Sequence, residues 1–410
     1  MFQKIFRSYI NSFSDLRREV WLLAFITFIN RAGTMVIPFL SLYLTKSRGF
    51  SLEEVGWILT FFGLGSVAGS WVGGKLVDSI GHYKTMTASL LLSAVLFVLL
   101  QFPVSFWSIC AGIFLVMLVA DAFRPAVFVA ISAYSKPENR TRSVTLIRLA
   151  INLGFSAGPA VGGLIIANSG YSGLFWVDGI TCFLAGLLLL KLLHPKKAKE
   201  NVKEVNLNPQ AVLNDKPYLL FIGAMILFGF IFIQYFSTMP LYYSEVHLLP
   251  ESDIGLLLGI NGFLIFLLEM PLIKYMETKN SSALQNVILG TFLVAISFLV
   301  LNLTGWIGAL LVGMLFMTIG EMIAFPFSNT FALKRAERGK QGSYMALYSI
   351  AFSISHIFGH NSGMQLIGEF GFNLTWYIMV FLGVVACALI LWLIRILKKE
   401  AVSYSSTPIL

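Results

Sequence analysis

Long apolar stretches separated by short polar turns run along almost the whole chain. A membrane-spanning helix needs about 20 consecutive apolar residues, and these stretches are long enough to meet that requirement. Twelve of them are expected to span a membrane, at residues 21–44, 53–77, 83–102, 105–134, 142–168, 172–193, 217–244, 252–275, 282–303, 305–333, 341–367 and 373–396. The pattern therefore predicts an all-α membrane protein with 12 transmembrane helices.

A single long polar interruption, at residues 194–216, separates six predicted spans from the other six. Two halves of this kind are typical of transporters built from internal repeats. The expected organisation is an N-terminal six-helix bundle at 1–193, a cytoplasmic linker at 194–216 and a pseudo-symmetric C-terminal six-helix bundle at 217–410. An unrelated polytopic enzyme with twelve helices is the alternative. The first apolar run is too long for a cleavable signal peptide and is expected to remain as a span.

The composition agrees with a membrane protein and excludes several other classes. Of the 410 residues, 57% are hydrophobic and 12% are charged, whereas about 25% of the residues in a soluble domain are charged. A soluble enzyme, a disordered scaffold and a nucleic-acid-binding protein are therefore excluded. The three cysteines, Cys110, Cys182 and Cys387, lie inside apolar runs and predict no disulfide framework.

The positive charges are distributed unevenly between the two sides of the predicted membrane. If the N-terminus is placed inside, 24 of the 29 Lys and Arg residues fall on the cytoplasmic side, 2 outside and 3 within spans. Cytoplasmic loops carry the excess of Lys and Arg, so both termini are expected in the cytoplasm. The short loops and the lack of a signal peptide favour a plasma membrane, namely a bacterial inner membrane.

The loop between the second and third spans reads GKLVDSIGHYK at residues 74–84. Gly74 and Gly81 allow sharp turns, and Asp78 can cap a helix or pair with a cation, so that the loop latches two helices. The run resembles the loop 2–3 signature of the major facilitator superfamily, Gly-x-Leu-Ala-Asp-Arg-x-Gly-Arg-Lys. Ser79 stands where the signature has its first Arg, and His82-Tyr83 stand where it has Arg-Lys. Lys84, one position later, takes the place of that Lys.

The fifth predicted span contains the run GFSAGPAVGG at residues 154–163. Small residues at four-residue spacing let membrane helices pack backbone to backbone, and a proline bends the helix. The residues that carry the motif are Gly154, Gly158, Pro159, Gly162 and Gly163. The run resembles the antiporter signature of the superfamily's drug:proton exporters, although Thr145 replaces a glycine further upstream. A close-packed, bent helix in any superfamily member is the alternative.

Four ionisable residues at membrane depth are the main candidates for function: Arg31, Asp121, Arg124 and Glu321. A charge near the bilayer centre costs about 2.5–3.5 kcal/mol even on the insertion scale, so such a residue normally faces a cavity or a partner. Asp121 and Arg124 share a helix face at a spacing of three residues and can pair. Pro125 frees a carbonyl one turn back and bends that helix.

Both carboxylates are expected to carry protons, because a carboxylate in a low-dielectric site exchanges its proton as a nearby cation arrives or leaves. Glu321 and Asp121 are therefore the proton-coupling candidates. Arg31 and Arg124 are expected to hold an anionic substrate group or to exchange carboxylate partners. A fixed buried ion pair is the alternative for each of them.

Several further residues are weaker candidates. Tyr235 is expected to face a substrate cavity, as is His356, which shares a helix face with His360. No Cys, Asp or Glu on that face completes a metal site, so no metal is predicted. Glu269, near the cytoplasmic end of the eighth span, is expected to act as a gate or latch, with proton coupling as the alternative. Asp178, near the outer end of the sixth span, is expected to snorkel or to cap a helix.

No phosphate-binding loop, His-Glu-x-x-His motif or nucleophile elbow is present, so neither an enzyme nor ATP-driven transport is expected. Uphill transport without a cofactor must use an ion gradient, and the intramembrane carboxylates favour protons. The resemblance implies a secondary active transporter that works by alternating access and exports small amphipathic or drug-like molecules in exchange for protons.

Two alternatives stay open. Arg124-Pro125 looks like the Lys-Pro of proton-coupled oligopeptide symporters and favours symport of short peptides or other zwitterionic solutes. A non-transporting membrane scaffold is the third possibility. The expected partners are a small-molecule substrate and the lipid bilayer, with no nucleic acid, and the protein is expected to be a monomer.

Overall fold

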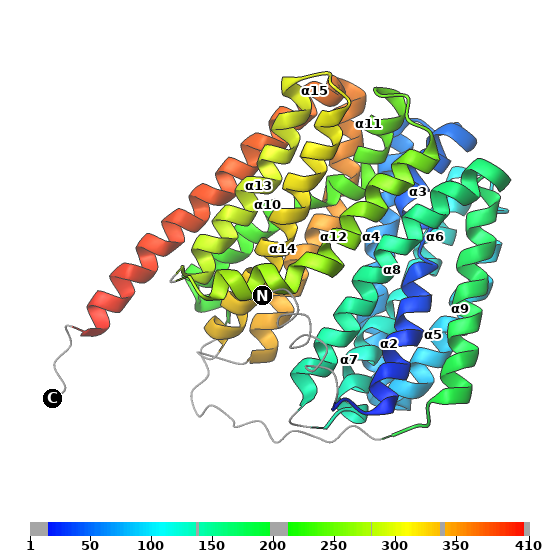
Figure 1. Cartoon of the computed structure of the whole chain (residues 1–410), viewed down its shortest axis with the longest axis horizontal. Coiled ribbons are helices and arrows are strands. Elements are labelled where there is room, and N and C mark those ends of the chain that lie inside the picture. The colour runs from blue at the N-terminus through cyan, green and yellow to red at the C-terminus, as the bar shows by residue number, and fades with distance from the viewer. Residues whose placement is uncertain (1–14, 137–138, 197–211, 280, 337–340, 406–410) are drawn as a thin grey trace. The chain divides into compact units, whose positions relative to one another are not determined.

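The computed structural model describes residues 15–136, 139–196, 212–279, 281–336 and 341–405 (Figure 1). Every regular element within these ranges is helical. This follows from the solvent, because a backbone that crosses hydrocarbon must satisfy its N–H and C=O groups internally. The central part of the predicted linker, at 197–211, lies outside the described residues.

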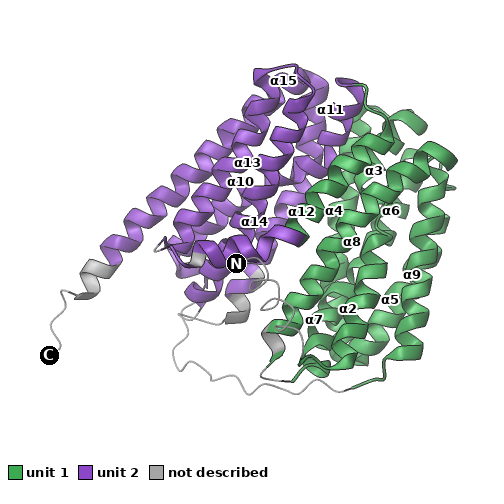
Figure 2. Cartoon of the chain, in the orientation of Figure 1, with its two compact units in different colours: residues 1–202, 248–266 green, residues 203–247, 267–410 purple. Residues whose placement is uncertain are grey.

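The chain divides into two compact units, which Figure 2 shows in green and purple. Unit 1 comprises residues 1–202 and 248–266. Its helices are α2 (Arg18–Ala32), α3 (Val36–Leu42), the π-helix η1 (Tyr43–Ser47), α4 (Leu52–Ile80), α5 (His82–Leu99), α6 (Phe106–Asp121), α7 (Phe123–Tyr134), α8 (Arg140–Ser169), α9 (Ser172–Leu192) and the first part of α12 (Glu251–Glu277).

Unit 2 comprises residues 203–247 and 267–410. Its elements are the short 3-10 helix η3 (Val212–Asn214), α10 (Lys216–Ser237), α11 (Met239–Glu245), the rest of α12, α13 (Ala283–Leu303), α14 (Gly308–Ala336) and α15 (Gln341–Ser405). The two units differ from the expected halves in one place, because residues 248–266 pack with unit 1. There the Ser156 hydroxyl of α8 donates to the Gly259 carbonyl of α12 at 2.7 Å.

The described residues contain 11 helical segments that are long and apolar enough to cross a membrane. The last of them, at 347–400, is 54 residues long, which is more than twice the length of one span. The chain turns within it at Gly371, whose φ of 75° lies in the left-handed region that glycine adopts freely. Figure 1 shows α15 as two arms, coloured orange and red. The expected all-α fold is confirmed, and the count agrees with twelve spans once α15 is divided at Gly371.

Most of the tryptophan side chains are exposed and lie near the start of a helix. Seven of the eight are at least 47% exposed, namely Trp21, Trp57, Trp71, Trp107, Trp176, Trp306 and Trp392. Five of the seven lie within five residues of the start of a helix. Amphipathic rings of this kind gather at the level of the lipid headgroups. The exposed tryptophans agree with the hydropathy of the helices, and both indicate a multi-pass membrane protein.

Three spans are interrupted shortly before a proline. The first span breaks between α2 and α3, the fourth between α6 and α7, and the seventh between α10 and α11. Pro38, Pro125 and Pro240 follow these breaks, and each lacks the N–H that would bond the carbonyl four residues earlier. The bend predicted before Pro125 is confirmed, since α6 ends at Asp121 and α7 begins at Phe123.

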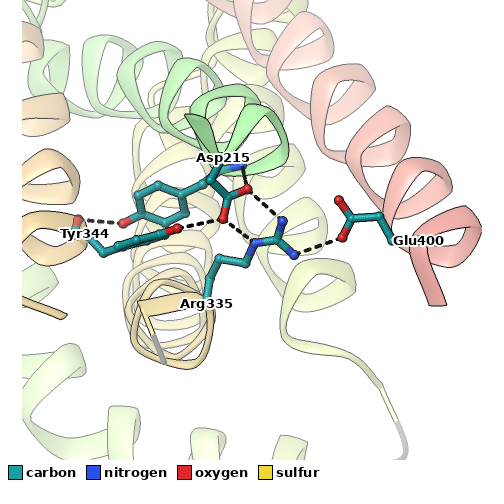
Figure 3. Close-up of polar contacts among 5 residues, drawn as sticks. Asp215, Arg335, Tyr344 and Glu400 are labelled. Atoms are coloured by element: carbon teal, nitrogen blue, oxygen red, sulfur yellow. Dashed lines mark hydrogen bonds and ion pairs between the residues drawn. The ribbon is translucent and has the colours of Figure 1, made fainter. Parts of the chain in front are cut away.

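A buried ion pair joins the end of the linker to the helices of unit 2 (Figure 3). Asp215 caps α10 by accepting from the Tyr218 N–H at 3.2 Å. Arg335, in the last turn of α14, donates to both carboxylate oxygens of Asp215, at 2.7 and 2.8 Å. The Tyr344 hydroxyl donates to the same carboxylate at 3.0 Å, and Arg335 also donates to Glu400 at 3.2 Å. Four helices, α10, α14 and the two arms of α15, are tied together by this cluster.

Removing the cation from this cluster is expected to be costly. Arg335 is 7% exposed and Asp215 is 1% exposed, so Arg335→Ala leaves a buried carboxylate without its partner. A loss of about 3–5 kcal/mol in stability is expected. The thermal midpoint of the detergent-solubilised protein, followed by tryptophan fluorescence, measures it. Lys334→Ala, at the exposed neighbouring position, is the control, and equal midpoints for the two variants would contradict the prediction.

The same carboxylate predicts a pH dependence. Burial by itself raises the pKa of Asp215, but the hydrogen bonds and charge of Arg335, with Tyr344 and the Tyr218 N–H, hold that pKa below its ordinary value of 3.8. The stabilisation is present above that ordinary value and is lost as the pH falls through the lowered pKa. The wild type is therefore expected to exceed Asp215→Asn in thermal midpoint by a constant amount from pH 7 to 5. The difference shrinks below pH 4, and a constant difference down to pH 3 would contradict the assignment.

Candidate functional site

Arg31 lies in the last turn of α2, directly before the break in the first span. Its guanidinium carbon is 5.7 Å from the centre of the Phe155 ring of α8, within the range of a cation–π contact. Gly154 of α8 lies beside it, and a Cβ there would come within 2.5 Å of the Arg31 Cβ. The buried Nε atom of Arg31 has no hydrogen-bond partner among the described residues.

Asp121, at the end of α6, is buried, with 3% of its surface exposed. Arg124 Nη2 lies 3.4 Å from Asp121 Oδ1, and the Ser66 hydroxyl of α4 donates to Oδ2. The pairing expected from the three-residue spacing is therefore confirmed. Both charges act on Arg31, which Asp121 attracts and Arg124 repels. We refer to Arg31, Asp121 and Arg124 as the unit 1 charge cluster, which holds two positive charges and one negative.

The glycines of the fifth span face the broken first span. A Cβ on Gly158 would lie 3.1 Å from the Ala32 carbonyl oxygen, and one on Gly162 would lie 3.2 Å from the Met35 Cβ. Together with Gly154, these residues form a groove without side chains on α8, into which residues 31–35 fit. The backbone contact predicted from the four-residue spacing is confirmed.

A second face of the same motif touches α12. A Cβ on Gly163 would lie 2.4 Å from the Glu251 carbonyl oxygen, and one on Gly255 would lie 2.3 Å from the Pro159 carbonyl oxygen. The helix α8 continues through Pro159 from Arg140 to Ser169. The motif therefore packs α8 against two helices at once, the first span and α12.

The loop after the second span is shorter than its sequence predicts. Helix α4 runs to Ile80, and Gly81, with a φ of 85°, is the only residue between it and α5. Asp78 is exposed in the last turn of α4, and α5 has Gly81 as its N-cap, so the expectation that Asp78 caps a helix is wrong. A Cβ on Gly74 would meet nothing within 4 Å, and Lys84 is exposed.

Unit 2 brings two of the predicted residues together. Glu321 is partly buried in the middle of α14, and its charge acts on the hydroxyl of Tyr235 in α10. Tyr235 is 1% exposed, so the ring expected to line a cavity is enclosed by unit 2. Its buried hydroxyl has no hydrogen-bond partner among the described residues. Glu269, in the part of α12 that belongs to unit 2, is buried with 6% of its surface exposed.

The two histidines of α15 lie side by side, with their ring centres 5.6 Å apart. His360 is buried, whereas His356 is partly buried. Next to His360 along the chain, the Gly359 carbonyl accepts a 2.8 Å hydrogen bond from the amide of Gln234, a fully buried residue of α10. The residues that the structure describes contain no group of three or more His, Cys, Asp and Glu side chains that could hold a metal ion.

Sequence reasoning missed Ser66 and Gln234 and understated Asp178. Ser66 and Gln234 are neutral polar residues of a kind that is common in membrane helices, and only their partners in space distinguish them. Asp178 is fully buried and accepts from two backbone N–H groups of the first span. The sequence does hold a signal for Asp178. An acid in an apolar run needs a hydrogen-bond donor, and Pro38 interrupts the first span and leaves backbone N–H groups there without their helical acceptors.

A model of the Major Facilitator Superfamily matches residues 20–360, which is most of the chain. The chain belongs to this superfamily. It is therefore a secondary transporter rather than an enzyme, as the resemblance implied.

Three curated relatives align over most of both chains. The uncharacterised MFS-type transporter YqjV of Bacillus subtilis is 25% identical and covers 88% of this chain and 89% of its own. A Na⁺, Li⁺, K⁺/H⁺ antiporter of Planococcus maritimus is 23% identical, with coverages of 92% and 95%. The multidrug resistance protein MdtH of Proteus mirabilis is 21% identical, with coverages of 80% and 82%.

The fold of the transporter is also found among solved structures. A crystal structure of a POT family transporter in complex with 5-aminolevulinic acid superposes with a TM-score of 0.76 and covers 93% of this chain and 96% of its own. At 16% identity, this likeness establishes the fold alone.

The groove on α8 predicts a sharp difference between glycines. In Gly154→Ala the new methyl group meets the Arg31 Cβ and the Ala32 backbone, and the variant is expected to lose about 1–3 kcal/mol of stability. In Gly74→Ala the methyl group meets nothing, and the higher helix propensity of alanine is expected to raise stability by about 0.5–1 kcal/mol. Thermal midpoints in detergent measure both, and a Gly154→Ala variant as stable as Gly74→Ala would refute the groove.

Proposed function

We propose that the transporter exports small amphipathic molecules, drug-like compounds among them, in exchange for protons. The observation that carries this proposal is the unit 1 charge cluster, where the buried carboxylate of Asp121 shares its surroundings with two guanidinium groups. A carboxylate in that position can release its proton when a cation approaches and regain it when the cation moves away. Proton binding is thereby linked to the movement of charged side chains.

Asp121 and Glu321 are the proposed proton carriers, one in each unit. Arg31 and Arg124 act as partners of Asp121 within unit 1, and His356 contributes to the substrate surface, whereas the Tyr235 ring is enclosed by unit 2 and is not assigned to that surface. The loop motif of Gly74, Asp78, Gly81 and Lys84 stays a predicted gating element, as does Glu269.

The names of two relatives support the class of activity. MdtH of Proteus mirabilis is a multidrug resistance protein, and the protein of Planococcus maritimus exchanges monovalent cations for protons. Export against a gradient without ATP-binding motifs requires an ion gradient, and proton exchange provides it. We place the transporter in a bacterial inner membrane as a monomer, with both termini in the cytoplasm, because its cationic residues cluster on that side.

A second candidate is proton-coupled symport of short peptides or other zwitterions. The surplus positive charge of the unit 1 charge cluster favours it, because a substrate carboxylate would complete the pairing of Arg31. The two candidates differ in the direction in which protons move relative to the substrate, which is a measurable quantity.

Proton movement in proteoliposomes tests the proposal. With an imposed pH gradient, a lipophilic cation is expected to alkalinise the proton-rich side. Glu321→Gln is expected to slow this response at least about tenfold, because an amide cannot carry the proton. Glu53→Gln, at an exposed position at the start of α4, is the matched control and should leave the rate unchanged.

Other responses would change the assignment. Proton and peptide moving in the same direction would establish symport and overturn export. A response to Na⁺ or K⁺ alone would identify cation/proton exchange. Silence with every compound would overturn the proposed coupling, and an unaffected Glu321→Gln would remove Glu321 from it.

A further inference from the structure

The break in the first span leaves two backbone donors outside the helix. Gly33 N–H still bonds the Ile29 carbonyl at 3.1 Å, and Thr34 N–H bonds the Arg31 carbonyl at 3.1 Å. The N–H groups of Met35 and Val36 come next, where α3 begins. A buried N–H in hydrocarbon without an acceptor is unfavourable, so the break needs a substitute acceptor.

Asp178 of α9 is that acceptor, although it lies more than 140 residues further along the chain. Its Oδ1 accepts from Met35 N–H at 2.9 Å, and its Oδ2 accepts from Val36 N–H at 3.0 Å and from Met35 N–H at 3.2 Å. The side chain is fully buried. Both oxygens are in use, so the carboxylate holds the start of α3 with two acceptors.

The same face of α9 holds the residues before the break. Thr181 and Cys182 lie three and four residues after Asp178, on the same side of the helix. A Cβ on Gly33 would lie 1.7 Å from the Thr181 hydroxyl oxygen. Asn30 Nδ2 lies 3.5 Å from Cys182 Sγ, to which it donates. Residues 30–36 are therefore held by α9 on one side and by the glycines of α8 on the other.

Arg31 is part of this clamped segment. Its backbone cannot shift without breaking the contacts of Asn30, Gly33 or Met35, so the direction of its side chain toward Phe155 depends on them.

We propose that Asp178 is a positioning residue for transport: by accepting the two free N–H groups of the broken first span, it aims Arg31 into the unit 1 charge cluster. The role of Arg31 rests on the proposed function, whereas the hold on the segment does not. In asparagine the NH₂ group would take the place of one carboxylate oxygen, and if it replaces Oδ1, the 2.9 Å acceptor of Met35 N–H is lost and a donor faces that N–H instead.

Alkylation of Cys182 tests the hold without any transport assay. Cys182 is 3% exposed and adjoins the clamped segment. In a Cys110→Ser, Cys387→Ser background, Asp178→Asn is expected to speed its labelling by N-ethylmaleimide at least about tenfold, because the segment loses an acceptor. Asp215→Asn, the buried capping aspartate of unit 2, is the control and should leave the rate unchanged.

An unchanged labelling rate in a folded Asp178→Asn variant would overturn the proposal. If that variant does not fold, Asp178→Glu gives the same test, because it keeps both acceptors but places them one methylene further out. Because the longer side chain displaces both oxygens from the Met35 and Val36 N–H groups, labelling faster than in the parent is expected for Asp178→Glu, and the parental rate would overturn the proposal.

Transport kinetics test the link to Arg31. Arg31→Gln and Asp178→Asn are each expected to raise KM for the lipophilic cation in the proteoliposome assay. The double variant is expected to raise that KM no further than either single variant. If the two increases in KM multiply in the double variant, Asp178 acts independently of Arg31. It would then be a helix cap only, and its positioning role would be overturned. Faster labelling in proteoliposomes that never transport would support the hold by Asp178 and count against the proposed function alone.

Discussion

Backbone hydrogen bonding in hydrocarbon is the constraint on which the rest of this structure depends. Water is absent from the bilayer core, so each N–H and C=O must find a partner within the protein. Continuous helices meet this condition along most of the chain. At the break in the first span the condition is met from another helix, because Asp178 of α9 accepts from the Met35 and Val36 N–H groups. The burial of Asp178 is therefore explained by the backbone N–H groups that it accepts from.

Close backbone packing follows from the same break. Residues 33–35 lie outside regular helix, and α8 approaches residues 31–35 where its own side chains are missing. Gly154, Gly158 and Gly162 provide that surface, while Gly163 on another face contacts α12. The signature that resembles the exporters' motif is therefore explained as a packing surface that supports Arg31 and also joins α8 to α12.

The two ion-pair clusters differ in their balance of charge. In unit 2, Arg335 lies between Asp215 and Glu400, and both oxygens of Asp215 are bonded to it. Such a fully satisfied pair holds helices together. In unit 1, Arg124 pairs with the buried carboxylate of Asp121, and Arg31, on which both charges act, keeps a buried Nε without a hydrogen-bond partner among the described residues. The unsatisfied cluster is the one suited to exchange partners, and for this reason our proposal for proton coupling rests on it.

The sequence alone determined the features that depend on periodicity within one helix. The spans follow from runs of about 20 apolar residues. The pairing of Asp121 with Arg124 and the bend before Pro125 follow from residues within about one helical turn of each other. Partners between helices were decided by the tertiary structure: Asp178 with Met35, Arg335 with Asp215, and Gly163 with Glu251. The helix that Asp78 was expected to cap, α5, has Gly81 as its N-cap instead. The physical reason is that a hydrophobic pattern states which residues avoid water, whereas lipid-facing and protein-facing sides of a membrane helix are equally apolar. Only helix packing distinguishes them.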